Sequence, residues 1–313
     1  MRYCSIILFA FILVIQSCDK SEATQPTIIT TGEIPGEFID DWTYKIHPFG
    51  NFDIGEFRLW LPNNADSLRA ILVLCNHHNS DALGLANVEH WQQYAEREQL
   101  AIIGVHFKSF PDGRNYYSTA SEGSGSALIK AIDTLASKHL HYELKDLPLL
   151  MRGYSAGGVF SHNFSEFMPD RVLAFANIRG GSVDFTKSTN NHIPGMMLLG
   201  EFDAETRNRQ MKRIVNAKRE EGGNWSYAIE PRSDHFGNLA PSDSLIKLMF
   251  SKALSKRVSS NGLMNNIEEK SGYLGNNETL EYYPFETYPY DKNNASWLID
   301  EEFAIAWKNY QEN

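Results

Sequence analysis

A serine enclosed by glycines is the feature of the sequence that points most directly to covalent catalysis. The segment LLMRGYSAGGVF, residues 149–160, carries Ser155 in the pattern Gly-x-Ser-x-Gly. A serine hydroxyl becomes a nucleophile only when a base removes its proton, and a substrate carbonyl must be able to approach it. A sharp turn from a strand into a helix exposes the hydroxyl, and flanking glycines prevent clashes in that turn. The apolar run before Ser155 and the helical pattern after it predict this context.

An acid and a histidine follow the serine in the chain order Ser, Asp, His that such a site requires. Asp203 comes shortly after the apolar run that ends at Gly200, and His235 comes shortly after the next apolar run. In this hypothesis His235 is the general base and acid, and Asp203 fixes its tautomer. Two other acids are alternatives to Asp203. Glu201 lies closer to the end of the run, and Glu205 is expected in the first turn of a helix.

Two backbone N–H groups are expected to stabilise negative charge on the reacting oxygen. One belongs to Ala156, at the start of the helix after the serine. The other lies in CNHHNSD, residues 75–81, where His78 is the first choice and His77 the second. The two histidines and Asp81 also allow a metal site as an alternative. Adjacent histidines point in different directions on an extended chain, and no H-E-x-x-H pattern completes a site. Neither a metal nor an organic cofactor is therefore predicted.

The surrounding sequence predicts strands that alternate with helices. Short apolar runs, several of them continuous, are typical of strands buried on both faces. These runs are residues 57–61, 70–75, 101–107, 147–152, 172–178, 196–200 and 225–230, and helical patterns fall at 87–99, 126–139, 157–167, 204–221 and 242–254. Alternation of this kind predicts an α/β fold with a doubly wound, mostly parallel sheet flanked by helices.

The two ends of the chain differ from this pattern. Residues 1–17 combine a positive charge with an apolar stretch that is too short to span a bilayer and is typical of a signal peptide. The stretch runs into Ile15-Gln16-Ser17-Cys18, which resembles a bacterial lipobox and implies lipidation at Cys18. Residues 18–36 are then a tether, and residues 37–313 a single domain exported to the cell envelope and anchored in the membrane by lipid. The aromatic-rich tail, residues 271–313, is expected to cross the surface as an irregular strap that ends in a short helix.

Composition bounds the possible partners and cross-links. The chain has 29 Lys and Arg against 39 Asp and Glu, a net charge of −10 and no strongly basic stretch, so nucleic-acid binding is not predicted. Cys4 would leave with the signal peptide and Cys18 would carry lipid, which leaves Cys75 as a single thiol. One thiol forms no internal disulfide, so the domain depends on its hydrophobic core. The sequence leaves the oligomeric state open.

The segment GYSAGGVFSHNFSEFMPDRVLAFANIRGG, residues 153–181, resembles the α/β-hydrolase superfamily. It is most similar to secreted esterases of the polyhydroxybutyrate depolymerase and feruloyl esterase type. Those esterases carry G-x-S-A-G-G and a later Pro-Asp step, matched here at residues 168–172. The resemblance covers residues 52–255 and implies Ser155 as nucleophile, Asp203 as acid and His235 as base. The chain departs from the family in lacking its His-Gly oxyanion motif.

Together these features predict a serine esterase that hydrolyses a small or polysaccharide-linked ester. Arg114, Tyr116 and Tyr117 are possible substrate-binding residues, because they follow a strand at the catalytic edge of the sheet. The alternatives are a serine peptidase of the prolyl-oligopeptidase type and a lipid-anchored, non-catalytic binding protein on a hydrolase scaffold. The remaining histidines considered are expected at the surface or in loops: His47, His90, His139, His141, His162 and His192.

Overall fold

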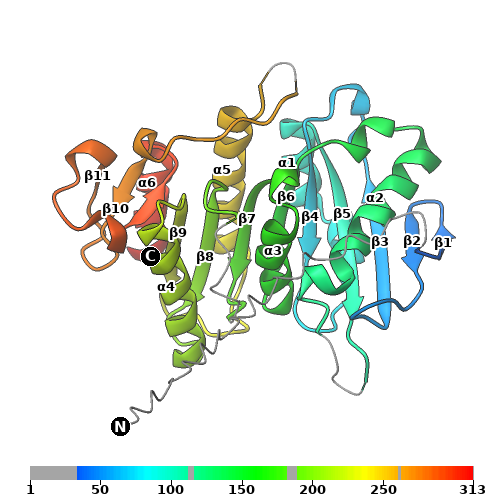
Figure 1. The fold of residues 1–313 in the computed structure, drawn as a ribbon, viewed down its shortest axis with the longest axis horizontal. Coiled ribbons are helices and arrows are strands. Elements are labelled where there is room, and N and C mark those ends of the chain that lie inside the picture. Colours follow the sequence, from blue (N-terminus) through cyan, green and yellow to red (C-terminus); the bar gives the residue numbers. More distant parts are fainter. Residues whose placement is uncertain (1–33, 112–115, 182–188, 260–261, 313) are drawn as a thin grey trace, which may run out of the picture.

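A computed structural model describes residues 34–111, 116–181, 189–259 and 262–312. Within these residues, a nine-stranded sheet has the order β1-β2-β3-β5-β4-β6-β7-β8-β9 (Figure 1). Strands β1 to β3 pair antiparallel with one another and β3 pairs antiparallel with β5, whereas all pairs from β5 to β9 are parallel. The strands are β1 (Gly36–Asp40), β2 (Thr43–Ile46), β3 (Ile54–Trp60), β4 (Ala70–Cys75), β5 (Leu100–Lys108), β6 (Leu149–Tyr154), β7 (Val172–Ile178), β8 (Gly195–Gly200) and β9 (Trp225–Glu230).

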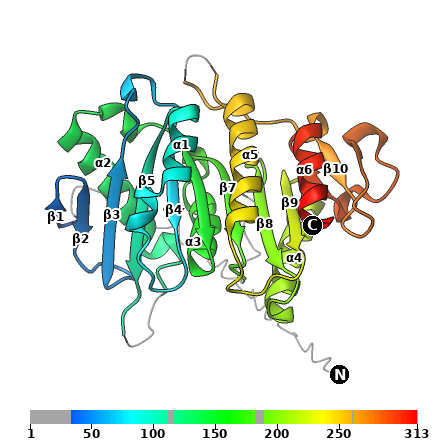
Figure 2. The same cartoon turned by 180° about the vertical axis from the view of Figure 1, so that it is seen from behind.

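Helices cover both faces of this sheet, as Figures 1 and 2 show from opposite sides. One face carries α2 (Ser124–His139), α3 (Ala156–Phe167) and α4 (Glu205–Glu220); the other carries α1 (Glu89–Glu98), α5 (Ala240–Arg257) and α6 (Glu301–Glu312). Strand β4 shows why its sequence is continuously apolar. Its odd-numbered side chains, such as Val73, pack in one core cluster, and its even-numbered ones, such as Leu72, pack in the other. The predicted doubly wound, mostly parallel sheet is confirmed.

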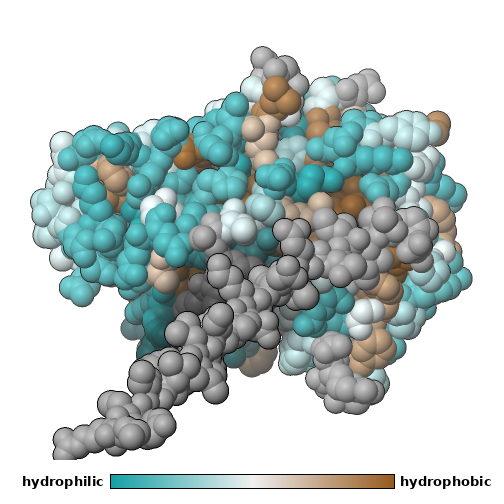
Figure 3. Space-filling model, viewed as in Figure 1, coloured by the Kyte–Doolittle hydropathy of each residue, from teal (hydrophilic) through white to brown (hydrophobic). Residues whose placement is uncertain are grey.

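The face of the molecule that Figure 3 shows is largely hydrophilic, with apolar side chains in scattered patches. No helix in the described ranges has the length and apolar composition needed to cross a bilayer. The predicted signal peptide, residues 1–17, and the lipidation site at Cys18 lie outside the described residues, as does most of the predicted tether.

The tail contains regular structure that differs from the irregular strap expected from its sequence. Strand β10 (Tyr273–Gly275) pairs antiparallel with β11 (Tyr282–Pro284) and with β12 (Ser296–Leu298), and α6 follows. This small sheet lies beside the β9 end of the large one (Figure 1), where Ser296 Oγ accepts a hydrogen bond of 3.0 Å from Tyr227 N. Strands of three residues carry too few positions for a periodic pattern, so their sequence resembled a loop.

His162 is completely buried on α3, which corrects the expectation of a surface histidine. Its ring centroid lies 5.6 Å from that of Phe175 and 5.1 Å from that of Trp225. Its Nε2 lies 3.6 Å from Glu166 Oε1, and Lys218 Nζ lies 3.4 Å from the same oxygen. Burial, together with the charge of Lys218, lowers the pKa of His162 to about 3. The ring is therefore neutral and packs as part of the core.

Candidate active site

Ser155 stands in a strained turn between the end of β6 and the start of α3. Its φ of 55° and ψ of −122° are uncommon for any residue other than glycine. A Cβ atom on Gly153 would lie 1.9 Å from Gly157 O, and one on Gly157 would lie 2.4 Å from Asn76 O. The chain folds this tightly only because both positions are glycine. Such local strain is characteristic of functional sites, and here it projects the serine from the carboxyl end of a parallel strand.

Ser155, His235 and Asp203 form one hydrogen-bonded chain. Ser155 Oγ lies 3.0 Å from His235 Nε2, and His235 Nδ1 lies 3.1 Å from Asp203 Oδ2. The three residues follow β6, β9 and β8, whose carboxyl ends meet at the same edge of the sheet. This arrangement allows the imidazole to take a proton from the serine while the carboxylate holds the other ring nitrogen.

Of the three acids near the end of β8, Asp203 is the one that contacts His235. Its second carboxylate oxygen, Oδ1, accepts a hydrogen bond from Arg207, whose positive charge offsets that of the buried carboxylate. Glu201 accepts a hydrogen bond of 2.7 Å from Arg232 N and so contacts the backbone of the His235 loop. Glu205 is exposed in the first turn of α4. The side chains of Glu201 and Glu205 therefore have other partners or face water.

The loop after β4, which carries the predicted oxyanion donor His78, contacts the start of α3, where the predicted donor Ala156 lies. Gly157 N donates to Asn76 O at 3.0 Å, which joins the two segments. His77 N donates to Asn76 Oδ1 at 2.9 Å. Within the described part of the chain, the N–H groups of Ala156 and His78 donate no hydrogen bond. These two N–H groups therefore have no acceptor among the described residues, whereas the N–H of His77 has one in the Asn76 side chain.

The side chains of the CNHHNSD segment diverge. The His77 ring lies edge-on to Tyr154 with centroids 5.8 Å apart, and His78 stacks on Tyr116 at 4.8 Å. Burial and the neighbouring His77 lower the pKa of His78. Asp81 Oδ1 accepts a hydrogen bond from a backbone N–H at 2.7 Å. No group of three or more His, Cys, Asp or Glu side chains that could hold a metal ion exists among residues that the structure describes.

Aromatic rings pack in two groups that the neighbouring residues His77 and His78 link along the chain, and we call this set the aromatic belt. Its members are Tyr116, His78, His77, Tyr154, His235 and Phe236, and the ring centroids of Tyr154 and His235 lie 5.5 Å apart and those of His235 and Phe236 lie 4.9 Å apart. Tyr116 is 49% exposed and Phe236 is 79% exposed. Tyr117, by contrast, is buried beside His78. Arg114, the third residue predicted to bind substrate, lies outside the described residues.

Tyr154 and Arg179 contact the backbone of His235, and neither is among the site residues predicted from the sequence. Tyr154 Oη donates to His235 O at 2.6 Å, and Arg179 Nη1 donates to the same oxygen at 3.3 Å. Burial raises the pKa of Tyr154, which keeps its hydroxyl protonated as a donor. One signal was present in the sequence, because Arg179 is a charged residue directly after a continuous apolar run.

Comparison with known proteins gives matches by structure. No family model matches the chain, and no curated protein matches its sequence. Poly(aspartic acid) hydrolase-1 from Sphingomonas sp. KT-1 is similar at 17% identity over 66% of this chain and 97% of its own, with a TM-score of 0.52. The poly(3-hydroxybutyrate) depolymerase LpqC from Bordetella parapertussis is similar at 13% identity over 75% and 92%, with a TM-score of 0.48. A thermostable esterase is similar at 19% identity over 57% of this chain, with a TM-score of 0.46; the chain spans about half of that esterase, 51% of its length.

The strand order decides the architecture. An antiparallel β3 lies next to β5, β4 lies between β5 and β6, and the serine turn follows β6. The chain has the α/β-hydrolase fold. At identities this low the similarity establishes the fold, and the resemblance inferred from residues 153–181 is confirmed at that level. In open α/β sheets ligands bind at the carboxyl ends of the strands, and Ser155 lies at that edge.

Proposed function

We propose that the protein is a serine hydrolase that cleaves carboxylic esters through an acyl-enzyme. The observation that carries the proposal is the chain of hydrogen bonds from Ser155 Oγ through His235 to Asp203 Oδ2, with lengths of 3.0 and 3.1 Å. Bonds of this length suit proton transfer to and from an imidazole whose tautomer is held by a carboxylate. The fold shared with a poly(aspartic acid) hydrolase also supports a hydrolase.

In the first step Ser155 Oγ bonds to the acyl carbon while its proton passes to His235 Nε2. The carbonyl π bond opens, and the resulting oxyanion accepts hydrogen bonds from the N–H groups of Ala156 and His78. His235 then gives its proton to the alcohol oxygen as the ester C–O bond breaks. The alcohol leaves and the acyl group stays on Ser155.

In the second step water takes the place of the alcohol. His235 removes a proton from the water as its oxygen bonds to the acyl carbon, and the same proton returns to Ser155 Oγ when the acyl–serine bond breaks. Throughout both steps Asp203 balances the charge of the imidazolium. Arg207, which donates to the outer oxygen of Asp203, keeps that carboxylate turned towards His235.

For the substrate we propose a carbohydrate-linked or small acyl ester. The aromatic belt supports this class, because it includes His235 and exposes the rings of Tyr116 and Phe236. Exposed aromatic faces suit a sugar ring or a planar acyl group. Export and a lipid anchor at Cys18 belong to the same proposal, and radiolabelled palmitate incorporation into the wild type, absent in Cys18→Ala, would test them.

The test of the proposed function combines turnover with covalent labelling. Wild type, Ser155→Ala and Ser137→Ala are assayed on para-nitrophenyl acetate and butyrate and treated with a fluorophosphonate probe. Ser137 is an exposed serine on α2 and serves as the matched control. We expect wild type and Ser137→Ala to hydrolyse both esters and to label, and Ser155→Ala to do neither. A folded wild type that neither labels nor turns over would favour the binding-protein alternative, and labelling with hydrolysis of peptides alone would favour the peptidase.

A further inference from the structure

The backbone of His235 is held by residues outside the Ser155–His235–Asp203 chain. His235 lies in the loop of residues 231–239, which joins β9 to α5 and contains neither strand nor helix. Its carbonyl oxygen accepts hydrogen bonds from Tyr154 Oη at 2.6 Å and from Arg179 Nη1 at 3.3 Å. The same Arg179 nitrogen donates to Gly237 O at 3.0 Å. The direction of an imidazole on such a loop depends on how firmly the backbone beneath it is held.

Arg179 combines two unfavourable features at one position. It directly follows β7 with a left-handed φ of 51°, which L-residues other than Asn and Asp rarely adopt. Its side chain is also completely buried, and a buried guanidinium is tolerated only when it is paired. Backbone strain and a buried charge are both typical of functional sites, and both occur here in a residue that contacts the His235 loop.

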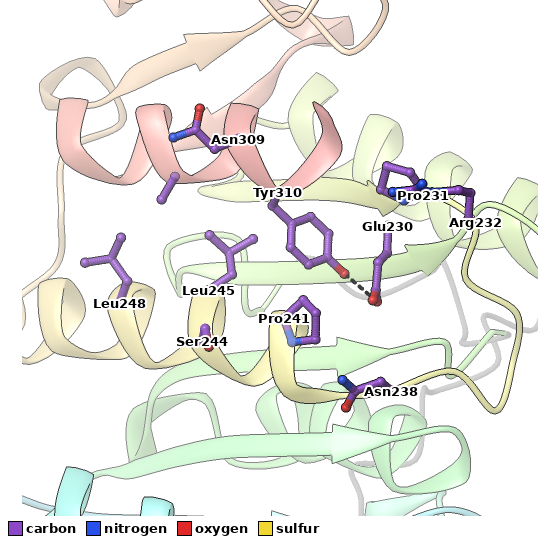
Figure 4. A pocket seen from close by; sticks show the side chains of 11 residues that line it. Glu230, Pro231, Arg232, Asn238, Pro241, Ser244, Leu245, Leu248, Asn309 and Tyr310 are labelled. Carbon is purple, nitrogen blue, oxygen red and sulfur yellow. Dashed lines mark hydrogen bonds between the residues drawn. The ribbon is translucent and has the colours of Figure 1, made fainter. Parts of the chain in front are cut away.

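Glu230, at the end of β9, fixes the direction of this guanidinium. Arg179 Nη2 donates to Glu230 Oε2 at 2.6 Å and to Ser233 Oγ at 2.6 Å. Glu230 Oε2 also accepts a hydrogen bond of 3.1 Å from Tyr310 Oη, which Figure 4 shows pointing across a pocket of about 610 Å³ between α5 and α6. The C-terminal helix therefore reaches the His235 loop through two intervening side chains.

The loop lies so close to the guanidinium that a larger residue would displace it. A Cβ atom on Gly237 would lie 2.4 Å from Ser233 Oγ and 3.3 Å from Arg179 Nη1. Both loop residues that bracket His235, Ser233 and Gly237, are thus hydrogen-bonded to the arginine. The hydrogen bonds of Arg179 therefore hold the loop on both sides of His235, as expected of a residue that supports the His235 backbone.

We propose that Arg179 is a positioning residue for the reaction. It holds the carbonyls of His235 and Gly237 so that the imidazole meets Ser155, and Glu230 and Tyr310 hold the guanidinium in turn. This inference rests on the proposed function. It makes α6 part of the support for the site, although the helix contributes no residue to the Ser155–His235–Asp203 chain.

The test compares two buried arginines at opposite ends of β7. Arg179→Met/Glu230→Met removes both charges together, so that neither is left unpaired, and Arg179→Lys keeps the positive charge on a single donor nitrogen. Arg257→Lys is the matched control, because Arg257 is also buried and also donates to backbone carbonyls, but at the start of β7, to Val172 O at 3.0 Å and to Leu173 O. Kinetics on para-nitrophenyl butyrate give kcat and KM, and circular dichroism gives the fraction folded.

We expect the double variant to lower kcat on the order of 100-fold, because a displaced base misses its near-attack geometry. KM stays within about twofold of the wild type, since no substrate contact is removed. Arg179→Lys recovers part of kcat, because an ammonium reaches the loop carbonyls or Glu230 but not both. Tyr310→Phe, which removes one hydroxyl and retains the ring, lowers kcat less than the double variant. Arg257→Lys lowers Tm and leaves kcat unchanged.

Imidazole nitrogen NMR supplies a readout that does not depend on turnover. The His235 signals, assigned with His235→Gln, should shift in the double variant and in Arg179→Lys and stay in place in Arg257→Lys. Folded Arg179 variants with wild-type kcat and unshifted His235 signals would overturn the positioning role. If the wild type hydrolyses no ester, the proposed function fails, and the NMR signals alone decide whether Arg179 positions His235.

Discussion

Replacing His162 with leucine is expected to make the protein more tolerant of acid. The imidazole is completely buried on α3 against Phe175 and Trp225. Burial, with the charge of Lys218, lowers its pKa from 6.5 to about 3, so the folded protein keeps the ring neutral at a pH where the unfolded chain protonates it. Leucine has a similar volume and carries no titratable proton, so it fills the space and removes this difference.

The sign and size of the effect follow from proton linkage. The folded-state pKa of His162 lies below its unfolded value, so the unfolded chain binds more protons as the pH falls from 6.5 towards 3. The free energy of unfolding therefore decreases across this window, with a slope that approaches about 1.4 kcal/mol per pH unit. Between pH 7 and pH 5 the loss from this residue amounts to about 2 kcal/mol. Above about pH 8 the ring is neutral in both states and adds no slope.

Urea-induced unfolding, followed by tryptophan fluorescence at pH 5 and pH 7, measures the effect. The comparison uses the wild type, His162→Leu and His47→Gln, in which the replaced ring is exposed to water. Between the two pH values we expect His162→Leu to lose about 2 kcal/mol less stability than the wild type, and His47→Gln to follow the wild type. Equal losses in the wild type and in His162→Leu would refute the conclusion that burial keeps this histidine neutral.

Three further outcomes are expected. Asp203→Asn lowers kcat on para-nitrophenyl butyrate by on the order of 10⁴, because the amide favours the wrong tautomer of His235. Glu205→Gln, the control, retains kcat. Equal effects of the two changes would show that Asp203 is not the acid that orients His235. Iodoacetamide at pH 8 modifies Cys75 only after unfolding, because burial raises the pKa of this thiol to about 12. Peptide mass spectrometry that finds modified Cys75 in the native protein would contradict this prediction. Gly157→Ala destabilises the protein by about 1–3 kcal/mol and lowers kcat, since the new Cβ lies 2.4 Å from a backbone oxygen. Gly84→Ala, whose Cβ meets no atom within 4 Å, does neither, and thermal melts compare the two.

The sheet could be predicted because the amino-acid composition of its strands indicates that they are buried. A strand such as β4, apolar at every position, is stable only with both faces covered, which requires parallel neighbours and helices on either side. The positions of Ser155, Asp203 and His235 could also be predicted from local sequence, since each residue follows the end of a strand. Parallel strands bring their carboxyl ends to one edge, so chain order alone indicated that the three residues meet.

The sequence by itself thus determined the class of fold and the three residues that approach one another at its edge. Tertiary structure alone decided that His162 is buried, that the three-residue strands of the tail pair, and that Arg179 lies beneath the His235 loop. The physical reason is the same in each case. The burial of a polar side chain, or the pairing of a strand too short to show a period, depends on partners far away in the chain, and no local pattern records them.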